Sequence, residues 1–172
     1  PCILVANHSS YIDAFCLVAK LPYCFRFVAK AEFKDNVFTK VMFGRIGVEF
    51  VERFDREQSV QDARNLVELN ESILFFPEGT FTRKPGLSDF HLGAFIVAVK
   101  TNRPVIPITI AGTRSILRAD SLFPRRGQIS ITVGEPIPVP KTGDDWHKAM
   151  LLKEQARREI LAHCHEPDLE GG

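Results

Sequence analysis

The sequence has almost no net charge, because 22 lysines and arginines offset 21 aspartates and glutamates. A nucleic-acid-binding domain usually carries a basic excess, so this balance argues against a nucleic-acid partner. The four cysteines are scattered and form no C-x-x-C pair. Their distribution indicates a reducing, cytosol-facing compartment and argues against a structural zinc site. We therefore predict that the protein holds no metal.

Long apolar runs, leader sequences and repeats are also missing from the sequence. No run approaches the roughly 18 apolar residues that a membrane span requires, and no signal peptide is visible. The chain begins at Pro1, directly against its first predicted strand. We therefore expect residues 1–172 to be a single domain excised from a longer protein whose N-terminal part is missing. That missing part is a candidate location for a membrane anchor.

Short apolar runs alternate with amphipathic segments along the chain. These patterns predict strands over 2–6, 25–29, 47–53, 72–76, 105–110 and 129–133, and helices over 14–21, 36–46, 59–69, 93–101 and 146–164. The inward stripe of the last helix consists of Ala149, Leu152, Ala156 and Ile160. The alternation predicts an α/β fold, in which a mostly parallel central sheet is covered by helices. Pro107 lies inside the fifth strand, which indicates a sheet edge, a bulge or a close approach by another segment.

A histidine follows the first predicted strand, in the stretch Asn7-His8-Ser9-Ser10-Tyr11-Ile12-Asp13. The Asp13 carboxylate lies five residues beyond His8, so it reaches the imidazole ring only if the chain bends between them. With such a bend, the two side chains have the parts of a general base and its orienting group. The alternative is a helix cap, because Ser10-x-x-Asp13 also looks like a capping box and Asn7 is an ordinary turn residue.

Two other segments carry polar residues at strand ends. Arg53 closes an alternating strand, where a guanidinium can bind a phosphate or a carboxylate or form a solvated salt bridge. The buried strand 72–76 opens into Pro77-Glu78-Gly79-Thr80 and a polar loop that contains Arg83. Open α/β sheets bind ligands in loops beyond the carboxyl ends of their strands. The sequence therefore predicts a ligand site that includes this loop.

Basic and apolar residues are interleaved in two places. The predicted helix 36–46 has one apolar face, which either packs on the sheet or contacts a lipid surface or an acyl chain. The segment 113–126 carries four arginines among apolar residues and is either a solvated loop or a contact with an anionic membrane surface or a phosphorylated acyl carrier. Both segments are candidates for peripheral membrane binding.

Four segments together closely resemble the sequence blocks of the glycerolipid acyltransferase family, typified by 1-acylglycerol-3-phosphate acyltransferases. They are Asn7-His8-x4-Asp13, Gly47-x5-Arg53, Phe76-Pro77-Glu78-Gly79-Thr80 and Val105-Ile106-Pro107-Ile108. The resemblance extends through Gly112-Thr113-Arg114 and Gly134-Glu135-Pro136. It implies a glycerol-phosphate acyltransferase-like fold and transfer of a fatty acyl group from acyl-CoA or acyl-carrier protein to a hydroxyl of a lysophospholipid.

The resemblance also implies a role for each residue that matches a block. His8 is then the general base, Asp13 its orienting group and Arg53 a phosphate ligand. The acceptor loop consists of Glu78, Gly79 and Thr80, and Pro107 shapes a substrate pocket. Many members have arginine immediately after the Glu-Gly-Thr triplet, whereas Phe81-Thr82 come before Arg83 here. This departure leaves the second phosphate contact, and therefore the acceptor, open.

The implied chemistry uses the acyl thioester as a co-substrate and requires no cofactor. The oxyanion of the intermediate would be held by backbone amides in the turn after His8 or around Gly79. The implied location is the cytoplasmic face of a membrane, with peripheral binding or an anchor in the missing N-terminal segment. Two other functions stay open at this point, a noncatalytic lipid- or phosphate-binding module and a hydrolase that uses the same His-Asp pair on water.

Overall fold

The computed structural model describes residues 1–21, 25–30, 48–51, 71–80, 83–117 and 123–169. The strands are β1 (Ile3–Ala6), β2 (Phe25–Lys30), β3 (Val48–Val51), β4 (Ser72–Phe75), β5 (Val105–Ala111) and β6 (Ser130–Val133). The helices are α1 (Asp13–Lys20), α4 (Gly93–Thr101), α5 (Thr113–Ile116) and α6 (Asp145–Cys164). The six strands lie where the apolar runs predict them. The predicted helices 36–46 and 59–69 fall outside the described residues.

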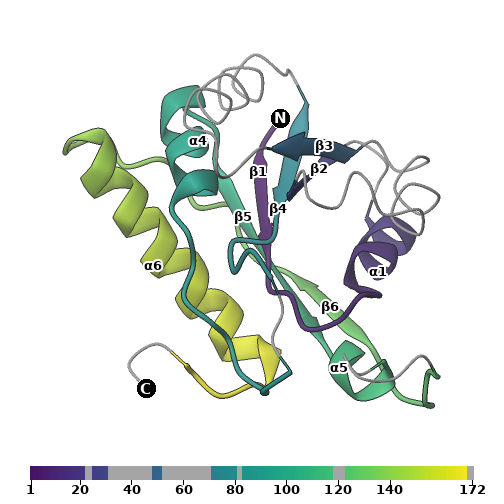
Figure 1. The fold of residues 1–172 in the computed structure, drawn as a ribbon. Helices are drawn as coiled ribbons and strands as arrows, with labels where there is room; N and C mark the ends of the chain where they lie inside the picture. The colour runs from purple at the N-terminus through teal and green to yellow at the C-terminus, as the bar shows by residue number, and fades with distance from the viewer. Residues whose placement is uncertain (22–24, 31–47, 52–70, 81–82, 118–122, 170–172) are drawn as a thin grey trace.

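The strands form one sheet in the order β3-β2-β4-β1-β5-β6 (Figure 1). The first five run parallel, and β6 pairs with β5 in the antiparallel direction. Helices α4 and α6 cover one face of the sheet, and α1 lies on the other. The predicted fold class, an α/β domain with a mostly parallel sheet covered by helices, is therefore confirmed.

The core divides at the central strand β1, because successive side chains of a strand point to opposite faces. Ile3 and Val5 pack into the cluster with α4 and α6, whereas Leu4 and Ala6 pack into the cluster with α1. Burying a side chain such as Ile3 or Val5 contributes roughly 1.5–3 kcal/mol. The predicted inward stripe of the last helix is confirmed, since all four of its members are at most 1% exposed.

Pro107 does not mark a sheet edge, because β5 lies between β1 and β6. The proline lies one residue before the segment of β5 that pairs with β6, and its carbonyl accepts from Gly134 N at 2.8 Å. A Cβ at Gly134 would lie 2.8 Å from the Pro107 ring. Of the three interpretations that the sequence allowed, the close approach of another segment is the one found. This approach needs a glycine at position 134, which lies against the Pro107 ring.

The parallel direction of β1, β4 and β5 brings their carboxyl ends to one edge of the sheet. Residues 7–13 follow β1, residues 76–80 follow β4, and Gly112 to Leu117 follow β5. Three segments that are distant in the sequence therefore meet at the edge where open α/β sheets bind ligands.

Candidate active site

His8 and Asp13 are in contact. His8 Nδ1 lies 2.9 Å from Asp13 Oδ2, and the same oxygen accepts from Ser9 N at 2.7 Å and Ser10 N at 2.8 Å. The chain therefore makes the bend that the spacing of five residues requires. Asp13 is fully buried, and the His8 side chain is 20% exposed. A buried carboxylate thus holds a partly exposed imidazole.

The predicted capping box is only half formed, because α1 begins at Asp13, its N-cap residue is Ile12 without a side-chain cap, and the Ser10 hydroxyl donates to Leu117 O. In a capping box, the acidic side chain accepts from a backbone amide at the start of the helix, as Asp13 does from Ser10. Asp13 N in turn donates to Ser10 O at 3.2 Å. The capping-box interpretation is therefore wrong for the Ser10 side chain, whereas one Asp13 oxygen both accepts from the turn amides and faces the histidine ring.

Asn7 has a larger role than that of an ordinary turn residue. Its side chain is buried and pairs with the backbone of Ile110, accepting from Ile110 N at 2.7 Å and donating to Ile110 O at 2.8 Å. These two bonds extend the pairing of β1 with β5 beyond Ala6. The residue before His8 is thereby fixed to the central sheet. The only sign of this role in the sequence is the position of Asn7 beside the histidine.

Glu78 fixes the backbone of His8. One carboxylate oxygen accepts from His8 N at 2.7 Å, and the other accepts from Ser88 N at 2.9 Å. Both oxygens therefore serve the protein backbone, which differs from the acceptor-ligand role that the family blocks imply. Burial raises the pKa of the Glu78 carboxyl above its ordinary value of 4.5, and the hydrogen bonds from His8 and Ser88 oppose that rise.

The raised pKa of Glu78 predicts a pH dependence of stability. The folded protein holds this proton more tightly than the unfolded chain, so the contribution to stability is complete below about pH 4.5 and is lost as the pH rises through the folded value. We expect the free energy of unfolding of the wild type, minus that of Glu78→Gln, to fall as the pH rises from about 4.5 toward neutrality. Urea unfolding of both proteins across this range measures the difference.

Glu71→Gln is the matched control for this measurement. A hydrogen bond from Arg26 lowers the pKa of the Glu71 carboxyl below 4.5. Its contribution to stability is present above that value and is lost as the pH falls through the folded pKa, so the corresponding difference should change in the opposite direction. A pH-independent difference for Glu78 would show that burial does not raise its pKa.

The imidazole ring of His8 is held from a second side by Phe76. The two ring centroids are 4.4 Å apart and the planes are inclined by 23°. Phe76 follows β4 directly and stands in the Phe-Pro-Glu-Gly-Thr block, so one segment contacts both the ring of His8 and, through Glu78, its backbone. With Nδ1 directed at Asp13, Nε2 is the ring nitrogen placed to exchange a proton with a ligand.

The other predicted site residues differ in their exposure and in their contacts. Thr80 and Arg83 are exposed, and Gly79 N donates to Phe76 O at 2.9 Å. Pro107 is buried within the sheet, and Arg53 lies outside the described residues.

The amides of Ser9, Ser10 and Gly79, which the sequence suggested as oxyanion donors, donate to protein oxygens. No group of three or more potential metal ligands occurs among the residues that the structure describes.

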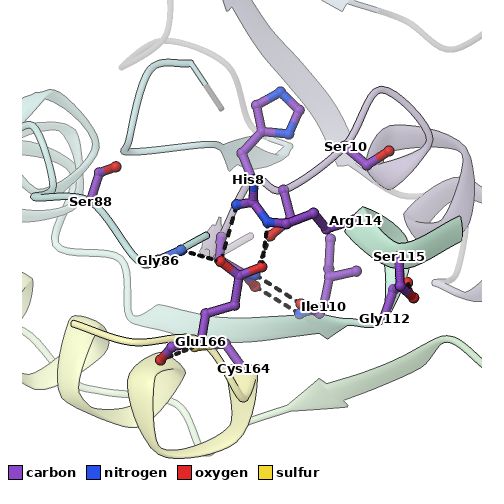
Figure 2. A network of polar contacts seen from close by, with 12 residues as sticks. His8, Ser10, Gly86, Ser88, Ile110, Gly112, Arg114, Ser115, Cys164 and Glu166 are labelled. Atoms are coloured by element: carbon purple, nitrogen blue, oxygen red, sulfur yellow. Dashed lines mark hydrogen bonds and ion pairs between the residues drawn. The ribbon is translucent and has the colours of Figure 1, made fainter. Parts of the chain in front are cut away.

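An ion pair that no local sequence pattern indicated lies near the Glu78 loop. Arg114 in α5 and Glu166 after α6 form two contacts, with Nε 2.7 Å from Oε1 and Nη2 3.0 Å from Oε2. Figure 2 shows the Glu166 carboxylate between Arg114 and the backbone of Gly86. Arg114 appeared in the sequence only as one of several basic residues, and nothing local indicated Glu166 as its partner.

Comparison with known proteins identifies the family. The Acyltransferase family matches residues 1–111. The chain is 32% identical to the chloroplastic 1-acyl-sn-glycerol-3-phosphate acyltransferase BAT2 of Brassica napus, over 93% of this chain and 45% of that protein. It is 30% identical to the human 1-acyl-sn-glycerol-3-phosphate acyltransferase beta, over 100% of this chain and 64% of that protein.

A solved structure shares the fold. The 1-acyl-sn-glycerophosphate acyltransferase PlsC of Thermotoga maritima superposes with a TM-score of 0.73, covering 92% of this chain and 64% of that one at 22% identity. The chain spans about half the length of the Brassica napus relative and of the matching 1-acyl-sn-glycerol-3-phosphate acyltransferase of Chlamydomonas reinhardtii. The match of residues 1–111, which contain the His8–Asp13 pair and the Glu78 segment, shows that the chain belongs to the glycerolipid acyltransferase family.

Proposed function

We propose that this protein transfers a fatty acyl group from an acyl thioester, either acyl-CoA or acyl-carrier protein, to a hydroxyl of a lysophospholipid such as 1-acylglycerol-3-phosphate. The observation that carries the proposal is the contact between His8 Nδ1 and the buried Asp13 carboxylate at the carboxyl edge of the sheet. The curated relatives with this acceptor in their names support the choice of acceptor.

The pair supplies what an alcohol nucleophile needs. A hydroxyl is a weak nucleophile at neutral pH, and a positioned base contributes about 10²–10⁴-fold to the rate. The acceptor oxygen forms a bond to the acyl carbon while His8 Nε2 takes the hydroxyl proton. The carbon–sulfur bond then breaks, and the proton passes to the departing thiolate. Asp13 holds Nδ1–H throughout and stabilises the imidazolium that forms.

Two arginines are candidate ligands for the acceptor phosphate. Arg53 remains the proposed phosphate ligand, and Arg83 is a second candidate because it follows the Glu78-Gly79-Thr80 segment. A guanidinium on the phosphate would fix the attacking hydroxyl near His8 and so turn binding energy into orientation. The same proposal includes Thr80 as part of the acceptor-binding loop and Pro107 as a residue that shapes the acyl or acceptor pocket.

One assay tests the proposed function against its alternatives. Thiol release from acyl-CoA is followed with and without 1-acylglycerol-3-phosphate. Acyl transfer predicts release that depends on the acceptor and an equal amount of diacylated product. Release without the acceptor indicates a hydrolase, and binding of either substrate without release indicates a noncatalytic module. Either of these two results rejects the proposal.

The proposal includes peripheral contact with the cytoplasmic face of a membrane. No helix among the described segments is long and apolar enough to span a bilayer. Phe123 is 82% exposed and is followed by the exposed Arg125 and Arg126. Arg125 N donates to Ile116 O at 2.8 Å, and Leu117 O accepts from Ser10 in the His8 turn. The basic and apolar segment predicted from the sequence is thus tied to the active-site edge.

We expect residues 1–172 to bind vesicles that contain anionic lipid and to bind neutral vesicles weakly. Each basic residue near an anionic surface contributes roughly 1 kcal/mol, so replacing both Arg125 and Arg126 with glutamine should weaken binding about 30-fold. The matched control replaces the exposed Lys141 and Arg158 and should leave vesicle binding unchanged. Equal sedimentation of wild type and the Arg125/Arg126 variant would contradict this surface.

A further inference from the structure

The segment Glu166–Leu169, which follows α6, lies along the loop that leads away from Glu78. Leu87 and Asp168 form an isolated parallel bridge, with Leu87 N donating to Pro167 O at 2.8 Å and Leu169 N donating to Leu87 O at 3.1 Å. Gly86 N donates to the Glu166 carboxylate. Gly86 has a φ of 142°, and a Cβ there would collide with the Leu169 side chain. The two segments therefore fit closely only with glycine at this position.

Two arginines, Arg114 and Arg157, contact the residues of this junction. Arg114 forms its two-point contact with Glu166, and their side chains are 17% and 15% exposed. Arg157 of α6 is 5% exposed and donates to Leu87 O at 3.1 Å and to Ser88 O at 3.3 Å. The guanidinium of Arg157 also pairs with the Asp168 carboxylate. Two largely buried arginines therefore contribute to the position of one short loop, which contains residues 86–88.

Stability alone is a poor explanation for the largely buried pair of Arg114 and Glu166. Removing two charges from water costs several kcal/mol per ion, and apolar replacements of buried pairs are often neutral or stabilising. A directional contact has a different consequence, because a carboxylate that accepts both from an arginine fork and from a backbone amide fixes the position of that amide. The arrangement at Glu166 specifies where Gly86 lies.

The position of this loop reaches the histidine through Glu78. Ser88 N, two residues after Gly86, donates to one oxygen of Glu78, and the other oxygen accepts from His8 N. A continuous series of contacts therefore runs from Arg114 to Glu166, Gly86, Ser88, Glu78 and the backbone of His8. Figure 2 shows the first part of this series below His8.

We infer that Glu166 is a positioning residue for His8 and that Arg114 holds Glu166 in place. The inference rests on the acyl transfer proposed above. It lies outside the residues that the family match covers, because Glu166 and Arg114 both follow residue 111. Displacing a catalytic group by about 1 Å can cost 10²-fold in rate, so a loop contact away from the chemistry is sufficient to control activity.

The first test replaces Glu166 with alanine. We expect kcat for acyl transfer to fall about tenfold or more with a smaller change in the KM of acyl-CoA, because the alignment of His8 is lost while donor binding is not. Amide hydrogen exchange of residues 83–90 should accelerate about tenfold, and exchange of β6 should not change. Glu154→Ala, at an exposed position of α6, is the matched control and should alter none of these quantities.

A charge reversal separates positioning from simple ion-pair stability. The double variant Arg114→Glu with Glu166→Arg restores opposite charges, but an arginine at position 166 cannot accept from Gly86 N. We expect its Tm to recover relative to each single variant while kcat stays low. Full recovery of kcat, or an unchanged kcat and exchange rate in folded Glu166→Ala, would overturn the inference.

The two proposals fail in different ways. If the wild type shows no acceptor-dependent thiol release, the proposed function is wrong, and the exchange rates of residues 83–90 still test the contact with Glu166. If the wild type transfers acyl groups and Glu166→Ala does so equally well while folded, the proposed function stands and the positioning role is rejected.

Discussion

Replacing His8 with alanine should lower kcat/KM for acyl transfer about a thousandfold, within the 10²–10⁴-fold range of a positioned general base. The imidazole Nδ1 pairs with the Asp13 carboxylate, which leaves Nε2 as the nitrogen that would take the acceptor proton. The fold should survive, because Asp13 keeps the amides of Ser9 and Ser10, and Glu78 keeps His8 N. The lost contact with Phe76 removes only modest packing. Steady-state rates and a circular dichroism melt measure both effects.

His163→Ala is the control for this substitution. His163 is an exposed histidine near the end of α6, and its Nδ1 lies 3.0 Å from the carbonyl of Glu159. Its removal should leave kcat/KM unchanged. A folded His8→Ala protein that retains a tenth or more of wild-type transfer would reject the assignment of His8 as the base.

Replacing Asp13 with alanine should impair both activity and stability. The orienting charge is lost, which we expect to lower kcat/KM about a hundredfold or more. The buried amides of Ser9 and Ser10 lose their acceptor, at about 1–3 kcal/mol for each unsatisfied group. We therefore expect the free energy of unfolding to fall by about 2–4 kcal/mol, measured by urea denaturation.

Asparagine at position 13 should separate the two effects. Its carbonyl oxygen can still accept from the turn amides and from Nδ1–H, so stability should suffer less than in Asp13→Ala while activity stays low. Asp144→Ala provides the control, since Asp144 caps α6 through a 2.7 Å bond from His147 N and has no role in the site. This change should cost about 1 kcal/mol of stability and leave kcat/KM unchanged. Wild-type activity in folded Asp13→Asn would contradict the orienting role.

The strands and the long helices could be predicted from local patterns. Apolar runs with polar breaks indicated all six strands, and the 3.6-residue stripe of α6 indicated which of its residues are buried. These predictions succeed because the side-chain period of an element is set within a few residues. The order of the strands and the antiparallel direction of β6 could not be predicted in this way, because they depend on pairings between distant segments.

For the site, the sequence by itself determined the chemical groups and the short-range geometry. His8 and Asp13 are five residues apart, so a single turn brings them together, and Glu78 follows a strand end. Only the tertiary structure decided what these groups contact. The bond from His8 N to Glu78 spans 70 residues, the pairing of Asn7 with Ile110 spans 103, and that of Arg114 with Glu166 spans 52. The first two contacts form because the parallel sheet places β1 beside β4 and β5, and the third forms because α6 packs on that sheet. No local pattern in the chain encodes any of them.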